Sequence, residues 1–384
     1  MMTKKGLTAT VVIMSIVIIS VLSVGLLLQS ANPVGDPRQI TDILEREVEV
    51  PQQVERVAGI GIGALRTLVY LECSEMIVGR GATDLKLRYV LPYLLAEPSL
   101  TNLTEIESSD SVNMEVIISL APDVIVASYY TAEDANRIQE NTLIPVVVVR
   151  PGEGASEPLN YSDDRNDFYE SLRIVGAIMG KENRAGNVIS YVKSLAEDLK
   201  ERTDEIPDNT KPTVYVGGLS RKGSFGLTMT QRAYPPFVLT KSKNVAGDID
   251  SLSNTVEIDA EQLIDWDPDI IFVDEVNLPL VLEDITDPKF SNLSAIVSGE
   301  VYGLFPYPRY GLNHGVVFAD AYYVGKTLNS TKFSDIDPEA KADEIFSFLV
   351  GEAVYDQMAD AMGGFKKIQL DTVGELFWAP TIKP

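Results

Sequence analysis

The sequence has few of the residues that build disulfides and metal sites. It holds one cysteine, Cys73, and one histidine, His314, among 384 residues. A disulfide framework needs paired cysteines, and zinc sites draw most of their ligands from several cysteine and histidine side chains. We therefore expect neither a disulfide scaffold nor a multi-histidine metal site, and we assign no metal ligands.

The chain also lacks recognisable catalytic motifs. No G-x-S-x-G or H-E-x-x-H sequence is present, and no pair of carboxylates has a spacing that marks an acid and a base. We assign no catalytic residue and expect no enzymatic reaction.

Basic side chains are scarce. Lysine and arginine number 32 against 56 aspartates and glutamates, which gives a formal net charge of -24. Such a chain repels the phosphate backbone, so general nucleic-acid binding is excluded. The hydrophobic content of 45% and the length are nevertheless sufficient for a folded protein with two domains.

The amino-terminal region is typical of a membrane anchor. Residues 7–28 are apolar and uncharged, and Lys4 and Lys5 precede them. About 20 such residues cross a bilayer as a helix, and the preceding positive charge keeps that end cytoplasmic. We expect 1–31 to be an anchor or signal segment, with retention favoured because the run is long for a signal peptide. Residues 32–38 would form a tether to an extracytoplasmic chain at the cell membrane.

Four N-x-S/T sequons are compatible with that exterior location, although such triplets also occur by chance. They lie at Asn102, Asn160, Asn292 and Asn329.

Apolar segments of strand length alternate with helical segments, which is typical of parallel sheets covered on both faces. The predicted strands are 46–51, 56–60, 76–78, 124–127, 146–149, 213–216, 270–273 and 301–304. The predicted helices are 64–71, 115–120, 261–266, 317–328 and 341–362.

A long helical stretch covers 167–203, with a break expected at 180–183. Its second part carries one apolar stripe, in which Val188, Val192, Leu195 and Leu199 recur at helical spacing. We predict an amino-terminal lobe at 39–182, an inter-lobe helix at 183–206 and a carboxyl-terminal lobe at 207–384.

An internal repeat indicates that the two lobes are related. Residues 113–126 align without gaps on 259–272, with five of fourteen positions identical, including one glutamate and a Pro-Asp pair. Each copy is a short helix, a Pro-Asp turn and a buried strand.

The segment from Gly59 to Ala64 fits the dinucleotide fingerprint G-x-G-x-x-A between a strand and a helix. An exported NAD-dependent oxidoreductase is therefore one alternative. The expected ribose-binding acid is missing after the next strand, where Arg80 follows Gly79, so a sharp strand-to-helix turn without a nucleotide is favoured.

Ligands of parallel sheets bind beyond the carboxyl ends of the strands. Arginines and tyrosines gather at these predicted ends, which indicates a positive cleft for an anionic, partly aromatic ligand. The candidate ligand-binding residues are Arg66, Arg80, Tyr129, Tyr130, Arg221, Tyr307, Arg309 and Tyr310.

The chain resembles the substrate-binding proteins of ABC importers for ferric siderophores, haem and vitamin B12. The resemblance rests on Thr41-Asp42, on 46–51 and 56–58, on the doubled helix-Pro-Asp-strand unit and on the long helix between the lobes. Tyr129 to Asp134, Tyr215 to Gly218 and Ala319 to Tyr323 resemble an archaeal branch of iron-complex binders.

The resemblance implies two Rossmann-like lobes joined by one backbone helix, the class III periplasmic-binding-protein architecture. It also implies a ferric siderophore-type chelate bound as substrate, no cofactor, and delivery to an ABC permease and its ATPase. Glu115 and Glu261 match the family's permease-docking glutamates; each would otherwise be a first-turn acid that stabilises its helix. A corrinoid or haem ligand stays open, as does a surface sensor or adhesion role without a transporter. The chain departs from the bacterial pattern in lacking a lipid-attachment cysteine after its apolar run.

Overall fold

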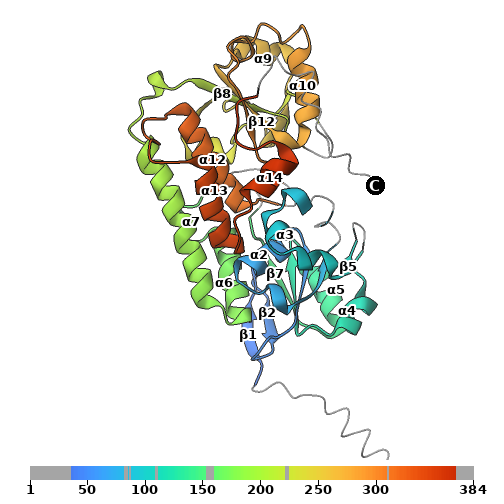
Figure 1. The fold of residues 1–384 in the computed structure, drawn as a ribbon. Coiled ribbons are helices and arrows are strands. Elements are labelled where there is room, and N and C mark those ends of the chain that lie inside the picture. Colours follow the sequence, from blue (N-terminus) through green and yellow to red (C-terminus); the bar gives the residue numbers. More distant parts are fainter. Residues whose placement is uncertain are drawn as a thin grey trace, which may run out of the picture.

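The computed structural model describes residues 36–368 except 82–84, 86–87, 109–110, 153–159, 221–224 and 309–310. Its elements form two α/β lobes, one above the other, with a long helix running along both (Figure 1). The expected anchor at 7–28 lies outside the described residues. Within the described ranges, no helix has the length and apolarity to cross a bilayer.

The amino-terminal lobe is built on a parallel sheet in the order β5-β4-β3-β6-β7. Its strands are β3 (Val57–Gly61), β4 (Ile77–Gly81), β5 (Thr104–Glu107), β6 (Val124–Ser128) and β7 (Val146–Val149). Its helices are α2 (Ala64–Tyr70), α3 (Pro92–Ala96), α4 (Met114–Leu120) and α5 (Ala132–Thr142), with 3-10 turns η1 (Ser74–Met76), η3 (Arg88–Val90) and η4 (Pro98–Asn102). An antiparallel hairpin, β1 (Arg38–Thr41) and β2 (Glu47–Val50), precedes the sheet.

Both faces of this sheet are buried, as the apolar strands predict. Alternate residues of β3, β6 and β7 pack on α4 and α5 on one face, and the residues between them pack on α2 and the later helix α6 (Asp167–Met179). Such double coverage explains why β7 is four consecutive valines, all buried.

The carboxyl-terminal lobe has a parallel sheet in the order β10-β8-β12-β13. Its strands are β8 (Thr213–Gly217), β10 (Lys243–Asn244), β12 (Ile270–Asp274) and β13 (Val301–Leu304), beside an antiparallel pair, β9 (Met229–Gln231) and β11 (Thr255–Glu257). Its helices are α8 (Pro235–Leu239), α9 (Ala260–Trp266), α10 (Leu278–Thr286), α11 (Ser294–Val297), α12 (His314–Leu328), α13 (Pro338–Val350) and α14 (Tyr355–Met362), with η5 (Asp208–Thr210) and η6 (Glu275–Asn277). Helices α9 to α11 cover one sheet face, and α8 and α12 cover the other.

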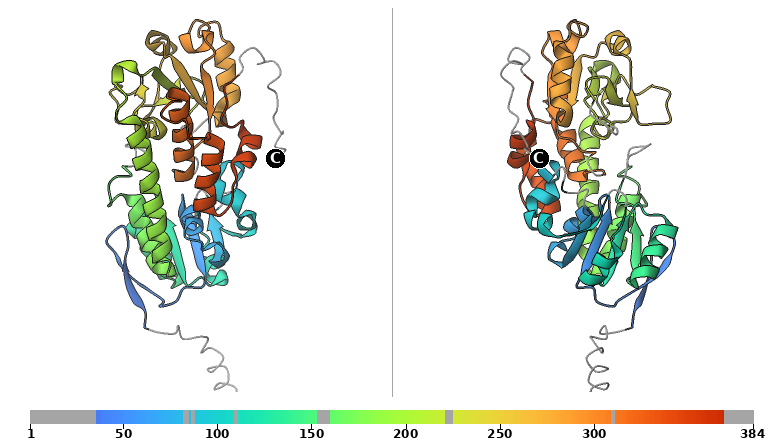
Figure 2. Two further views of the ribbon diagram at one scale, coloured as in Figure 1. Left: turned by 60° about the vertical axis from the view of Figure 1, so that its left-hand side comes forward. Right: turned by 90° about the vertical axis from the view of Figure 1, so that its right-hand side faces the viewer.

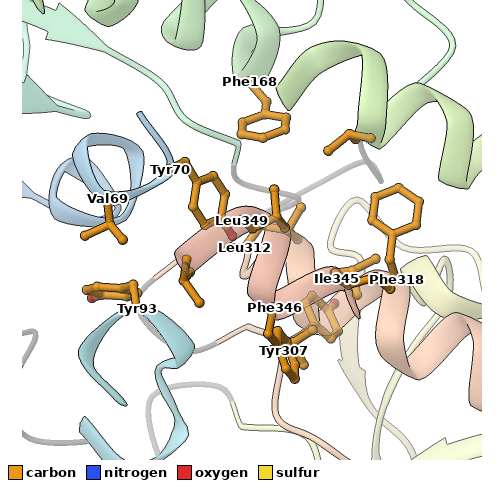
Figure 3. Packing of buried hydrophobic residues seen from close by; sticks show 14 of the residues in the cluster. Val69, Tyr70, Tyr93, Phe168, Tyr307, Leu312, Phe318, Ile345, Phe346 and Leu349 are labelled. Atoms are coloured by element: carbon orange, nitrogen blue, oxygen red, sulfur yellow. The ribbon is translucent and has the colours of Figure 1, made fainter. Parts of the chain in front are cut away.

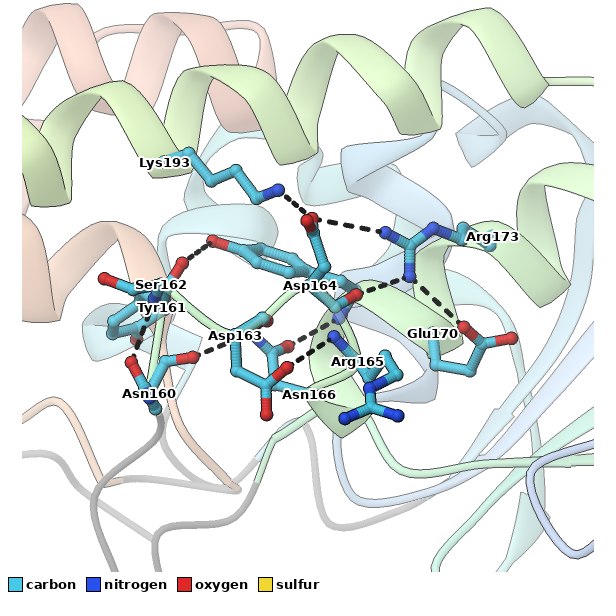
Figure 4. A network of polar contacts seen from close by, with 11 residues as sticks. Asn160, Tyr161, Ser162, Asp163, Asp164, Arg165, Asn166, Glu170, Arg173 and Lys193 are labelled. Atoms are coloured by element: carbon cyan, nitrogen blue, oxygen red, sulfur yellow. Dashed lines mark hydrogen bonds and ion pairs between the residues drawn. The ribbon is translucent and has the colours of Figure 1, made fainter.

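The long helix α7 (Glu182–Thr203) runs beside both lobes (Figure 2). It forms a hairpin with α6, and Gly180 makes the turn in the left-handed conformation, φ 65°. Lys193 of α7 and Arg173 of α6 both pair with Asp164 in the loop before α6 (Figure 4). This network fixes the hairpin to the loop that leads into it.

One hydrophobic core is continuous across the lobes. Val69, Tyr70 and Tyr93 from the amino-terminal lobe pack in the same cluster as Phe346 and Leu349 of α13 (Figure 3). Helix α13 contacts α2 and α3 directly. A shared core of this kind opposes large independent movements of the lobes.

The predicted repeat is confirmed as a structural repeat. The two helices, α4 and α9, end at residues with left-handed backbone, Ala121 and Asp267. The Pro-Asp aspartate that follows then accepts hydrogen bonds at the start of the neighbouring strand. Asp123 Oδ2 accepts from the backbone nitrogens of Glu55 and Arg56, and Asp269 Oδ2 accepts from that of Thr213.

Several predicted boundaries are wrong. Strand β4 continues to Gly81, because β5, which was not predicted, pairs with its last residues. The predicted closing helix at 341–362 is two helices, α13 and α14, separated at Gly351, whose φ of 92° ends the first. Helix α12 begins at His314, three residues before the predicted start.

Candidate ligand-binding site

The glycine turn after β3 is held by a carboxylate from the edge of the sheet. Glu107, at the end of β5, accepts the Gly61 backbone N–H at 2.7 Å through Oε2. Its other oxygen, Oε1, accepts the Tyr130 hydroxyl at 2.7 Å. Burial, with Glu107 as hydrogen-bond acceptor and negative charge, raises the pKa of Tyr130. Glu107 thus connects the ends of three strands, β3, β5 and β6.

This arrangement disfavours a dinucleotide at the glycine turn. A pyrophosphate would need the backbone N–H groups of the turn as donors, and Glu107 already accepts the one on Gly61. Its negative charge would also repel phosphate. Close packing explains why glycine is needed in this turn, since a Cβ on Gly61 would lie 2.1 Å from the Ser128 carbonyl oxygen.

Arg66 lies where the two lobes meet. It is 2% exposed in α2, and its Nη1 donates to Asn313 Oδ1, at the start of α12 in the other lobe, at 3.4 Å. Glycines make room for the guanidinium, because a Cβ on Gly63 or Gly311 would lie 2.7 Å or 3.3 Å from Nη2. The predicted arginine is therefore a buried cation at the junction of the lobes.

His314 is a structural bridge at this junction. Its Nε2 lies 2.9 Å from the Pro151 carbonyl oxygen and its Nδ1 lies 2.9 Å from the Tyr161 hydroxyl, while its ring stacks on Phe168. Burial, with the charge of Arg66, lowers the pKa of His314 to about 3. A neutral ring that donates to Pro151 and accepts from Tyr161 satisfies both contacts.

Tyr129 and Tyr130 lie where they were predicted, directly after β6, and both are half-buried. Tyr129 has a left-handed backbone with φ 63°. A bulky residue adopts this conformation at an energetic cost, and such residues are found preferentially at functional sites. The two tyrosines therefore remain candidate contact residues.

Arg80 and Tyr307 are both buried, and their polar groups bond within their own lobes. Arg80 is inside β4, 4% exposed, and its guanidinium donates to the carbonyls of Gly81 and Thr101. Tyr307 is in the core, where its hydroxyl donates to Gln231 and its ring packs on Tyr234. Arg80 was expected to be exposed because the end of β4 was predicted too early. Tyr307 was expected to be exposed because the segment after β13 was predicted to be an open loop. Arg221, Arg309 and Tyr310 lie outside the described residues.

The sequence places Asp274 and Glu275 directly after the predicted strand 270–273, but it did not predict that they belong to a buried acidic group. Asp274, Glu275 and Asp320 are all buried. Glu275 Oε2 accepts the Gly364 N–H at 3.0 Å, and Asp320 Oδ1 accepts the Phe305 N–H at 3.2 Å. Burial raises the pKa of Glu275 to about 8 and that of Asp320 well above its usual value. Among the described residues, no group of histidine, cysteine or acidic side chains could hold a metal ion.

A groove of 560 Å³ lies elsewhere, between the end of α2 and the end of α13. Glu72, Glu75 and Glu97 line it together with Arg184. Arg184 is already bound to the carbonyls of Tyr70 and Phe348. The net negative lining makes this groove unsuitable for an anionic ligand.

Glu115 and Glu261 are exposed in the first turns of α4 and α9. The two helices lie on separate lobes (Figure 1). The two glutamates occupy equivalent positions in the structural repeat. Neither forms an ion pair within the part of the chain that the structure describes. Both carboxylates are thus accessible to a partner.

The family model described as periplasmic binding protein matches residues 83–308. The molybdate-binding protein MolA of Haemophilus influenzae is 22% identical over 327 residues, covering 80% of this chain and 90% of MolA. The Fe(3+)-citrate-binding protein YfmC of Bacillus subtilis is 24% identical over 205 residues, which are 53% of this chain and 60% of YfmC.

Solved structures share the fold. A periplasmic solute binding protein from Veillonella parvula superposes with a TM-score of 0.66 at 20% identity. The match covers 85% of this chain and 97% of that protein. The two-lobe architecture with parallel sheets, predicted from the sequence, is confirmed.

Proposed function

Because this chain belongs to the periplasmic binding protein family, as a substrate-binding component of an ABC transporter, we propose that it captures a ferric siderophore-type chelate between its lobes. It delivers this cargo to the permease for import. A binding protein of this family catalyses no reaction and needs no cofactor, since the ligand is cargo.

The junction of the lobes is the observation that supports this proposal. Arg66 of one lobe meets Asn313 of the other there, and Tyr129 and Tyr130 follow the adjacent strand β6. A buried guanidinium favours an anionic ligand, and tyrosine offers a flat surface with a polar tip. The periphery of an acidic metal chelate combines these features. Arg221, Arg309 and Tyr310 complete the proposed ligand-binding set.

A small oxyanion is the second candidate ligand. MolA is named for molybdate and matches 80% of this chain, and a guanidinium flanked by glycines suits a compact oxyanion as well as a chelate. The two candidate ligands differ in size. The larger chelate would therefore need contacts with the tyrosines, whereas a small oxyanion would not.

The proposed location is extracytoplasmic, with residues 7–28 as a retained membrane anchor. Glu115 and Glu261, which are exposed on separate lobes, would dock to the permease. Their position in equivalent helices of the repeat supports a common role.

Ligand titration of the full chain in detergent tests the proposal. Ferric citrate, a ferric catecholate, haemin, cobalamin, molybdate and NAD are added separately while tryptophan and tyrosine fluorescence is recorded, with corrections for coloured ligands. Saturable, tight binding of a ferric chelate supports the proposal. Binding of molybdate alone selects the oxyanion, and binding of NAD alone overturns both.

A further inference from the structure

Six large hydrophobic side chains are exposed in the described part of the chain. They are Ile118, Leu143, Val238, Leu252, Ile264 and Val297. Two of them, Ile118 and Ile264, occupy the same position in the structural repeat, where both copies have isoleucine. They are 49% and 41% exposed. Isolated exposed apolar residues are ordinary, but the same residue exposed at the same position of two lobes is a pattern.

The local geometry of the two positions is the same. In each helix the preceding residue, Ile117 or Leu263, is fully buried against the lobe. The isoleucine therefore points away from the core for the same reason in both lobes. It lies three residues after Glu115 or Glu261, so the glutamate and the isoleucine share one face of the helix.

The surroundings of both isoleucines are acidic. On α9, Asp265 and Asp267 are exposed close to Ile264, and on α4 Glu115 is exposed and forms no ion pair with any other residue that the structure describes. A surface with an apolar centre and negative rim is complementary to an apolar pocket bordered by arginine or lysine.

We propose that Ile118 and Ile264 are the apolar contacts of a two-point docking surface, and that their partner presents the same basic, apolar-centred pocket twice. The partner is the permease, which would carry the two pockets on symmetry-related subunits, one for each lobe. This inference rests on the proposed function. It adds that docking depends on apolar burial beside the glutamates, and that both lobes contribute by the same kind of contact.

Binding of the full chain to its own permease and ATPase, reconstituted in nanodiscs, tests the inference. Ile118→Ser with Ile264→Ser should weaken binding at least tenfold, and each single substitution should weaken it by a similar, smaller factor. The loss should persist at high salt, because apolar contacts are not screened. Glu115→Gln with Glu261→Gln should instead reduce the salt dependence of binding.

Leu143→Ser with Leu252→Ser is the matched control, because these leucines are 88% and 99% exposed and lie outside the repeat. This control should bind the permease as the wild type does. The double isoleucine variant is then compared with a charge-reversed variant, Glu115→Arg with Glu261→Arg. If the isoleucine variant binds the permease as the wild type does and the charge-reversed variant does not bind, the inference is overturned but the proposed function is kept. Wild-type binding by both overturns the docking assignment as well. Sedimentation of the wild type and of the double isoleucine variant gives a further check. A dimer formed by the wild type but not by the variant would also overturn the inference, since the isoleucines would then contact a second copy of the chain.

Discussion

The carboxylate of Glu107 lies 2.7 Å from the backbone nitrogen of Gly61, so an acidic side chain occupies the turn that resembles a nucleotide-binding loop. The two residues are 46 positions apart in the sequence, so a short sequence motif cannot reveal this contact. The same carboxylate holds the Tyr130 hydroxyl. Its charge therefore acts on any ligand that approaches the ends of β3 and β6.

Glu107→Gln should increase affinity for an anionic ferric chelate. The amide keeps the shape of the side chain but removes one negative charge, which at a separation of about 8 Å and an effective dielectric constant of about 40 corresponds to about 1 kcal/mol, or about fivefold. Fluorescence titration with ferric citrate measures the change. Glu105→Gln, on the same strand and more exposed, is the control and should leave affinity close to wild type. A large loss of affinity in Glu107→Gln would instead mean that the carboxylate contacts the ligand directly.

Gly61→Ala should destabilise the protein by about 2 kcal/mol or more. The backbone at Gly61 has φ 77°, and the new Cβ would overlap the Ser128 carbonyl oxygen. Urea unfolding measures the change in the free energy of unfolding. Gly186→Ala, in the exposed face of α7 with no atom within 4 Å of the new Cβ, should stabilise by about 0.5 to 1 kcal/mol. Equal effects of the two substitutions would contradict the close approach at Gly61.

His314 should make the fold sensitive to acid. Its folded pKa of about 3 lies below the ordinary value of 6.5, so between these values the unfolded chain binds a proton that the folded chain does not. Stability contributed by the neutral ring is therefore present above about pH 6.5 and is lost as the pH falls towards 3, at up to about 1.4 kcal/mol per pH unit. Urea unfolding of wild type and His314→Gln at pH 7, 6, 5 and 4 tests this. The free energy of unfolding of the wild type minus that of the variant should decrease as the pH falls. A difference that is independent of pH would refute the assignment of a neutral, buried His314.

Glu275 should have the opposite dependence. Its folded pKa of about 8 lies above the ordinary 4.5, because burial disfavours the carboxylate. Stability from the protonated group is present below about pH 4.5 and is lost as the pH rises to about 8. The side chain of Glu275→Gln stays neutral at every pH. Relative to this variant, the free energy of unfolding of the wild type should therefore decrease over this range by up to about 1.4 kcal/mol per pH unit, and the difference should be constant above it. Unfolding measured at pH 5, 6, 7, 8 and 9 provides the comparison, and a constant difference would show that Glu275 is ionised in the fold.

Patterns of the repeat predicted local structure well. The alignment of 113–126 with 259–272 predicted two helix-turn-strand units, and the structure has them as α4–β6 and α9–β12. The exposed positions of Glu115 and Glu261 follow from the same pattern, because one buried residue per turn fixes which helix face meets the sheet.

The predicted exposure of Arg80 and Tyr307 was wrong, because it depended on where strands end and on what covers the residues that follow them. Arg80 falls inside β4 since the polar strand β5 pairs with it, and a sequence of four residues, TEIE, carries almost no strand signal. Tyr307 follows β13 as predicted, yet β9 supplies Gln231 to bury its hydroxyl. In both cases the partner is remote in the chain.

Local sequence patterns were sufficient to predict the α/β alternation, the repeat, the long helix α7 and the family resemblance, because hydrophobic periodicity and turn chemistry act over a few neighbouring residues. Which charges are buried, and what they bind, depends on how distant segments pack together in the folded chain. Glu107 meets Gly61, and Arg66 meets Asn313 247 residues away, through the packing of strands and lobes. The electrostatics of the site arise from such long-range contacts, since burial and neighbours set each group's charge and no local pattern encodes them.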